Sequence, residues 1–424
     1  MAKVTAEGLE VADLTIPINA PTTARQLLAR HTRRTLECVL ELPFEGLARP
    51  HAHALRHIAQ SVRSAYKTQH TRKIIMRALH KVHVSVLIHA CDRAAKDETV
   101  REEYPARVSR LIPVLLFELA RQRLLPDSGV PWPQLTYTLP WPESEWGLDL
   151  PVDIKGIIFF SGNLELVGGK YDATKINITG SDPPVIPGIN KVPAYTVITP
   201  GMVLTTLDTN PLSDFEAHPD KEGNQVDLGN KAPEEWTASM NQALEWIEQG
   251  LPVLAAEMKM LMQQWVPVGY EPMMHLSCSY QEAVGQAYLT LHPNPFTMME
   301  AMVHEFQHNK VNALWTLEPL LENAFWPLYS SPVRPDPRPL HGVLLAAHAF
   351  VPVAELYIKL REAGVERTLN PDTDRRLKTI VEGNHAGMEV VREHGKFTPM
   401  GARFFKQLDE MATAHLDAIA DIKL

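Results

Sequence analysis

Residues 304–308 read His-Glu-Phe-Gln-His, and residue types in this order could bind and use a metal ion. Side chains four residues apart lie on one face of a helix, so the imidazoles of His304 and His308 can hold a single ion between them. Glu305 follows the first histidine, where its carboxylate can reach a metal-bound water or orient the ligands. We therefore predict a metal site at His304 and His308, with Glu305 as its catalytic or supporting carboxylate.

The residues on both sides of this motif predict one long helix. No Gly or Pro interrupts the chain from Phe296 to Trp315. Thr297, with Glu300 three residues later, has the pattern of a capping box at a helix N-terminus. We therefore expect the helix to begin at Thr297.

A third metal ligand is expected, because two histidines rarely suffice at a catalytic metal. The extended zinc signature HExxHxxGxxH is absent, since no histidine stands at the required spacing after the motif. The expected helix 340–363 offers His341, His348 and Glu355, each seven residues from the next and so on nearly one face. We predict His348 or Glu355 as the alternative third ligands. Glu355 would complete a two-histidine, one-carboxylate set that suits iron, or it could simply pair with the lysine four residues on.

A proline-rich segment separates these two helices, reading Ser330-Ser-Pro-Val-Arg-Pro-Asp-Pro-Arg-Pro339. Proline stiffens the chain, and Arg334 and Arg338 flank Asp336 within it. A guanidinium offers a planar pair of donors that matches a carboxylate. The two arginines are therefore predicted to bind a carboxylate of a substrate or cosubstrate; the alternative is a structural ion pair with Asp336.

Histidines also gather elsewhere in the sequence. His53 and His57 have metal-compatible spacing, with His51 beside them, but their neighbours are basic and no carboxylate is near to orient the rings. We interpret this group as a solvated helix face. His292 precedes the motif helix and could line its cleft.

Composition places the chain among soluble globular proteins, with 424 residues, 45% hydrophobic and 21% charged. The net charge of −9 argues against nucleic acid as the main partner. Three widely spaced cysteines, Cys38, Cys91 and Cys278, suit a reducing compartment and argue against a disulfide framework or thiolate-bound zinc. Because no signal peptide and no apolar run of 18 residues is evident, we expect a cytoplasmic protein without a membrane partner.

Apolar periodicity predicts an α+β, mostly helical fold. An N-terminal helical region is expected over 1–125, and a β-containing middle region with a long helix, bent near Gly250, over 126–270. The metal-binding catalytic region follows over 271–424. Strands are expected at 276–279 and 286–291, so that the active-site helix packs beside a small antiparallel sheet. The middle region is expected to take part in binding a peptide.

Three segments together resemble one known family: 303–314, 332–340 and 342–350. They resemble the HExxH-motif peptide-modification proteins of ribosomal peptide natural product biosynthesis, and a domain fused to some radical-SAM maturases. The clear match covers roughly residues 275–365, and the ordered trio is far more specific than HExxH alone.

The resemblance implies an Fe(II)- and 2-oxoglutarate-dependent peptide β-hydroxylase that uses O₂ and acts on a precursor peptide. It implies that His304 and His308 bind iron and that Arg338 or Arg334 holds the 2-oxoglutarate carboxylate. Some relatives carry Tyr where His348 stands, which leaves the third ligand open. Two other functions stay open: a zinc metallopeptidase with Glu305 as general base, and an inactive peptide-binding protein.

Overall fold

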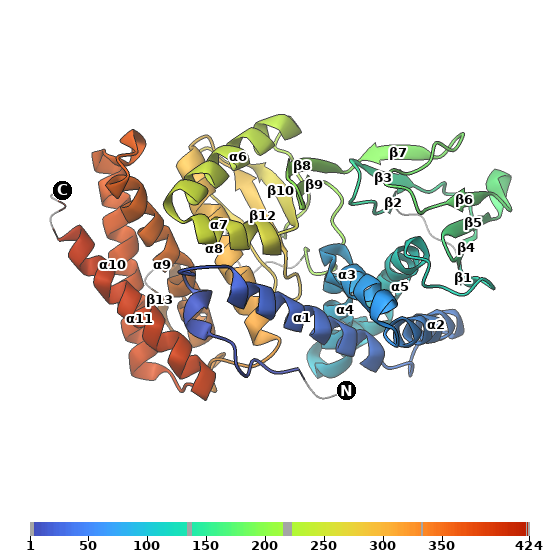
Figure 1. The fold of residues 1–424 in the computed structure, drawn as a ribbon, viewed down its shortest axis with the longest axis horizontal. Coiled ribbons are helices and arrows are strands. Elements are labelled where there is room, and N and C mark those ends of the chain that lie inside the picture. The colour runs from blue at the N-terminus through green and yellow to red at the C-terminus, as the bar shows by residue number, and fades with distance from the viewer. Residues whose placement is uncertain (1–3, 134–137, 215–222, 332–333, 421, 423–424) are drawn as a thin grey trace.

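The computed structural model describes residues 4–133, 138–214, 223–331, 334–420 and 422. Helices dominate both ends of the chain, and strands lie between them (Figure 1). The expected α+β, mostly helical fold is confirmed.

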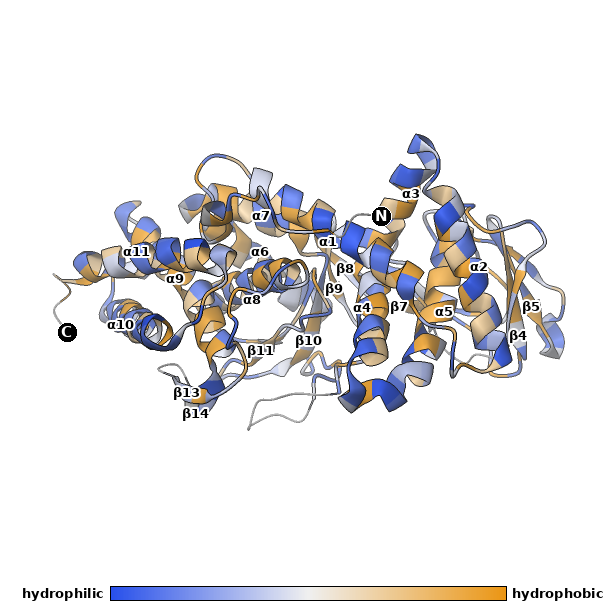
Figure 2. Ribbon diagram, turned by 90° about the horizontal axis from the view of Figure 1, so that it is seen from below, coloured by the Kyte–Doolittle hydropathy of each residue, from blue (hydrophilic) through white to orange (hydrophobic). Residues whose placement is uncertain are grey.

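The N-terminal part is a packed group of helices that are mostly amphipathic. α2 and α4 each show both hydrophilic and hydrophobic residues along their length in Figure 2. Helices α3 and α4 meet at an angle of 78°. The elements are η1 (Val11–Leu14), α1 (Thr22–Glu41), α2 (Arg49–Ala65), α3 (Gln69–His80), α4 (Val82–Lys96), η2 (Glu98–Glu103) and α5 (Tyr104–Arg121).

Two small antiparallel sheets follow. One has the strand order β1-β4-β5-β6 and the other β2-β3-β7. The elements are β1 (Val130–Pro133), β2 (Thr138–Leu139), β3 (Trp146–Asp149), β4 (Gly156–Phe160), β5 (Asn163–Val167), η3 (Gly169–Tyr171), β6 (Lys175–Asn177) and β7 (Asn190–Pro193).

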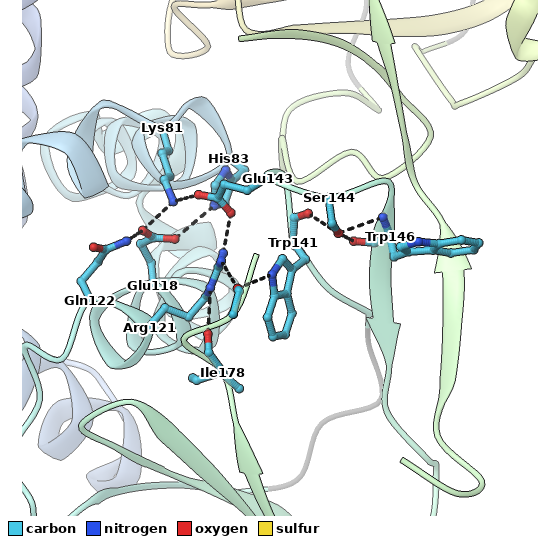
Figure 3. Close-up of polar contacts among 11 residues, drawn as sticks. Lys81, His83, Glu118, Arg121, Gln122, Trp141, Glu143, Ser144, Trp146 and Ile178 are labelled. Carbon is cyan, nitrogen blue, oxygen red and sulfur yellow. Dashed lines mark hydrogen bonds and ion pairs between the residues drawn. The ribbon is translucent and has the colours of Figure 1, made fainter. Parts of the chain in front are cut away.

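A network of charged and polar side chains fixes the loop between β2 and β3 to the N-terminal helices (Figure 3). Glu143 in this loop pairs with Lys81 and Arg121, and Lys81 also binds Glu118 at 2.7 Å. These two cations lower the pKa of Glu143 to about 2, even though burial opposes the shift. The guanidinium of Arg121 also lies over the ring of Trp141, 4.6 Å from its centre. Charge pairing therefore anchors the β region to the helices.

The motif helix packs beside a third, five-stranded sheet with the order β11-β12-β10-β9-β8. Strands β9, β10 and β12 run parallel, and β11 and β8 are added antiparallel at the two edges, so this sheet is mixed where a small antiparallel sheet was expected. The predicted strands at 276–279 and 286–291 are confirmed as β11 and β12. The strands are β8 (Tyr195–Thr199), β9 (Met202–Thr205), β10 (Gln264–Tyr270), β11 (Ser277–Cys278) and β12 (Gln286–Leu291).

The remaining helices cover this sheet and extend beyond it. α6 ends at Gly250 and α7 begins at Pro252, as predicted. A two-stranded hairpin, β13 with β14, joins α8 to α9. The elements are α6 (Pro233–Gly250), α7 (Pro252–Leu261), α8 (Pro295–Trp315), β13 (Leu328–Ser331), β14 (Arg334–Pro339), α9 (Leu340–Glu362), η4 (Glu366–Thr368), α10 (Pro371–His394) and α11 (Pro399–Ile419).

Buried apolar residues form two cores. One spans residues 36–189 together with Ala283, and the other combines residues 4–27 with residues 198–419. Helix α1 links them, because Leu27 belongs to one core and Leu36 to the other. The predicted boundaries at 125 and 270 both fall inside a core.

The segment before α1 packs against the buried side of α8. Gln307 Nε2 donates to Thr15 O at 2.6 Å, and Lys310 Nζ lies 3.4 Å from the same oxygen. Lys310 also pairs with Glu257 at 2.8 Å, and both side chains are fully buried. These contacts join α8 to the N-terminal segment and to α7 inside the core.

Helix α9 is long and apolar enough to cross a membrane by length and composition alone. Of its most apolar window, 67% is buried inside the protein, where α9 packs on α8, α10 and α11. This burial is what the core helix of a globular domain shows.

Candidate metal centre

One stripe of α8 is open, and the rest of the helix is buried. The helix begins at Pro295 with Asn294 as its cap, so the predicted start at Thr297 is wrong. An asparagine oxygen caps a helix as well as threonine does, and the proline at the first position suits the entry. The residues of α8 that are not fully buried are Pro295, Thr297, Glu300, His304, His308 and Trp315.

This spacing places Glu300, His304 and His308 in one row, each one turn from the next. The predicted histidine pair therefore lies at the centre of the open stripe. The Nε2 atoms of His304 and His308 face each other at 2.7 Å, with their rings at 83°. The two Nε2 atoms are close enough for both rings to bind one metal ion.

Burial sets the charge state of this pair. It lowers the pKa of His304 to about 3, with help from His275 and Arg376. It also holds the pKa of His308 well below its ordinary value, and the neighbouring His304, His341 and Arg338 act in the same direction. Neutral imidazole is the form that binds metal, so neither ring has to lose a proton first.

Glu305 completes a compact group of ligand atoms. Its Oε1 lies 4.0 Å from His304 Nε2, and the ligand atoms of His304, Glu305 and His308 all lie within 4.8 Å of one another. The hydroxyl of Ser279, just after β11, donates to Glu305 Oε2. Asn309 donates to the same hydroxyl oxygen at 3.2 Å and to the backbone oxygen of Glu305 at 2.9 Å. The carboxylate is thus held in one orientation toward the first histidine.

Neither predicted third ligand belongs to this group within the described part of the chain. His348 is fully buried, and its Nε2 donates to Leu14 O at 3.2 Å. Glu355 lies two turns further along α9, where its Oε2 accepts from His415 at 2.8 Å and its Oε1 lies 3.7 Å from Lys359. Contacts with the N-terminal segment and with α11 therefore already occupy these two side chains.

His341 is a further candidate for the third ligand, because its charge contributes to the low pKa of His308. It lies in the first turn of α9, its ring centre is 4.3 Å from that of Trp315, and burial lowers its pKa to about 4. Its Nδ1 is buried without a hydrogen-bond partner among the described residues. In the sequence, His341 shares the seven-residue spacing of His348 and Glu355. Its position three residues after Arg338 is the feature that distinguishes it from these two candidates.

Of the two predicted arginines, Arg338 acts electrostatically on the histidine pair. Its charge contributes to the low pKa of His308. Its Nε lies 3.5 Å from the point where a Cβ atom at Gly342 would stand, so the guanidinium lies close to the first turn of α9. Its Nη1 lies 3.4 Å from Asp336, so the structural ion pair considered above is also present, at long range. The side chain of Arg334 lies outside the described residues, as does the whole of Pro332 and Val333.

A cleft of about 660 Å³ opens at the Glu300 end of the stripe. His292 lines it, as considered above, and so does His275. Glu300 does not cap the helix; Arg376 of α10 pairs with it, with Nε 3.1 Å from each carboxylate oxygen, and Tyr357 donates to it at 2.6 Å. The ion pair between Glu300 and Arg376 could not be predicted from the sequence, because the two residues are 76 positions apart.

Sequence comparisons with protein-family models and with curated proteins give no relatives for this chain. No protein-family model matches it, and no curated protein sequence matches it either. The resemblance therefore rests on the three sequence segments alone.

Proposed function

We propose that the protein is an Fe(II)- and 2-oxoglutarate-dependent oxygenase that hydroxylates the β-carbon of a side chain in a ribosomally made peptide. The observation that carries the proposal is the group of ligand atoms from His304, Glu305 and His308, all within 4.8 Å of one another, together with the charge of Arg338, which helps to lower the pKa of His308. A dicarboxylate cosubstrate needs a fixed cation next to the metal, and hydrolysis of a peptide bond does not.

The residues present fit such a metal. His304 and His308 present their Nε2 atoms to each other, and His341 is the side chain we propose as the third ligand. When bound, iron with 2-oxoglutarate supplies the oxidation of an unactivated carbon by O₂. The protein's part is to hold the ligands, to bind the cosubstrate carboxylate through Arg338, and to orient Glu305 through Ser279.

A peptide substrate suits the open stripe of α8. The cleft at one end has Met273 and Met274 in its lining, 90% and 47% exposed. Beyond the other end, Phe325 and Trp326 are 57% and 76% exposed, and Phe325 packs on Trp315. Exposed Met, Phe and Trp are typical of surfaces that bind polypeptides. Apolar contacts on both sides of the histidines would hold a chain across them.

A zinc metallopeptidase is the second candidate, and the position of Glu305 favours it. Its Oε1, 4.0 Å from His304 Nε2, is placed where a general base would meet a metal-bound water. In that case Arg338 would have no cosubstrate to bind.

The test is an assay of the purified protein with a library of peptides, under air with Fe(II) and 2-oxoglutarate, and in parallel with Zn(II). We expect succinate and a peptide heavier by one oxygen atom. Glu305→Gln separates the two reactions, because a peptidase loses its base and nearly all activity, whereas an oxygenase keeps measurable turnover. Peptide cleavage with zinc and no succinate in any condition would contradict the proposal.

A further inference from the structure

A groove of about 990 Å³ runs between α2 and the edge of the first sheet, far from α8 along the molecule (Figure 1). A smaller groove of about 480 Å³ adjoins it and shares Phe44 and Arg56 with it. We call the two together the α2 groove. No part of the proposed reaction uses it.

All the charged residues that line the α2 groove are basic. They are Arg49, Arg56, Arg63, Lys67 and Lys155, and His53 lies among them. The whole chain carries a net charge of −9, so a group of basic residues without acidic ones is not expected from its average composition.

These five cations are also exposed and have no ion-pair partner among the residues that the structure describes. Some arginines elsewhere are neutralised within the chain, as Arg121 is by Glu143 and Arg376 by Glu300. A cluster of unneutralised cations lining a concave surface produces a positive potential that attracts an anionic partner.

The floor of the groove is apolar. Leu47, Pro50, Pro131 and Ile157 contribute to it, and α2 packs against β1 beneath it. A free phosphate or a small organic acid would not use such a floor. An acidic chain with apolar side chains would use both the floor and the cations.

The length of the groove points the same way. Arg49 and Arg63 are fourteen residues apart on one helix, which corresponds to about 21 Å. An extended chain covers this distance with about six residues. A polypeptide segment therefore matches the spread of the cations better than a small molecule does.

The prolines of β1 limit how the groove could bind such a segment. β1 is an edge strand, but Pro131 and Pro133 have no backbone N–H to offer a new strand. Recognition would depend on side chains and charge and not on extending the sheet.

The described residues that line the α2 groove offer no open Phe, Tyr or Trp ring on which a nucleic-acid base could stack. Trp132 is 2% exposed, and the ring of Phe44 is already covered by the guanidinium of Arg56 at 5.2 Å. Proteins that bind single-stranded nucleic acid stack bases on open aromatic rings. The geometry points to an acidic polypeptide segment with interspersed apolar side chains as the ligand of the α2 groove.

The test measures binding of a fluorescein-labelled peptide of six Glu and three Leu to the full-length protein by anisotropy, with a peptide of six Gln and three Leu as the control probe. We expect the acidic peptide to bind at least about tenfold more tightly, and its affinity to fall as salt rises.

The variant Arg56→Glu with Lys155→Glu should weaken binding roughly tenfold or more, because two exposed attractive charges become repulsive. Arg403→Glu is the matched control: Arg403 is exposed on α11 and lies outside the groove, so this variant should change the affinity less than twofold. Circular dichroism and bound metal should be the same in all three proteins.

Three results would overturn the inference. They are equal binding of the two peptides, an unchanged affinity in the double variant, and tighter binding of a nine-nucleotide single-stranded DNA than of the acidic peptide. Each of these is independent of whether the metal centre performs the proposed reaction.

Discussion

Helices α2 and α8 each carry two histidines four residues apart, and the two pairs have nearly the same internal geometry. The rings of His53 and His57 are 4.5 Å apart at 70°, and those of His304 and His308 are 4.3 Å apart at 83°. Helical spacing alone therefore fixes how two imidazoles face each other. It does not decide what they bind.

The surroundings of the two pairs are opposite. His53 is exposed and stands near Arg49 and Arg56, with no carboxylate in the lining of its groove. The α8 pair is half-buried, and the buried Glu305, held by its hydrogen bonds, lies between the two histidines in sequence. One pair belongs to a surface that attracts anions, and the other to a site that could hold a cation.

The largest predicted effect on stability comes from giving α2 the same His-Glu-x-x-His pattern as α8. Ala54→Glu would give α2 the sequence His-Glu-Leu-Arg-His. Ala54 is fully buried, so a carboxylate there has no water and no partner like Ser279. We expect a loss of about 3–5 kcal/mol in the free energy of unfolding by urea, and no gain of metal. A second equivalent of bound metal would show that the motif suffices without its surroundings.

Arg338→Ala tests the cosubstrate side of the α8 site. Charge-assisted hydrogen bonds contribute roughly 1.5–3 kcal/mol, so the affinity for 2-oxoglutarate should fall about ten- to a hundredfold. Arg338→Lys should also bind poorly, because an ammonium lacks the planar pair of donors. The measurement is the dependence of succinate formation on 2-oxoglutarate, with Arg334→Ala and Arg403→Ala in parallel. Unchanged affinity in both Arg338 variants would contradict the assignment.

Burial predicts how acid acts on the metal-free protein. The pKa of His304 is about 3 in the folded chain and about 6.5 when unfolded, so the unfolded state takes up the proton first. The free energy of unfolding therefore carries no penalty from His304 above pH 6.5, and it should be about 2 kcal/mol lower at pH 5 because the unfolded state is protonated there.

Unfolding of the apoprotein at pH 7.5 and pH 5 checks this. His304→Gln should reduce the loss between the two pH values by about that amount. His57→Gln should change it much less, because His57 is partly exposed and the pKa shift from its burial is small. Equal pH dependence in the wild type and in His304→Gln would exclude burial as the cause.

The smallest effect is expected at the α2 pair itself. His53→Ala with His57→Ala should change the free energy of unfolding by less than about 0.5 kcal/mol, as exposed substitutions usually do. A large loss would mean that these rings are part of the N-terminal core.

Local patterns predicted much of this structure. The helix of the motif, the two strands before it, the break between α6 and α7 and the fold class all follow from periodicity, glycine and proline. The contacts that orient the site do not, because they join distant segments. Ser279 reaches Glu305, His348 binds Leu14 O, and Glu355 binds His415. A histidine or a glutamate on the right helix face can be drawn to any of several partners, and only the packed structure decides among them.

The central claim is that surroundings, and not spacing, make the α8 pair a metal site. The direct measurement is bound metal per chain after anaerobic loading with Fe(II) and gel filtration. We compare the wild type with His304→Ala, with His308→Ala and with the double variant His53→Ala/His57→Ala. The account predicts one ion per chain in the wild type and in the α2 double variant, and none in either α8 variant. Full metal content in the α8 variants, or its loss in the α2 variant, would contradict it.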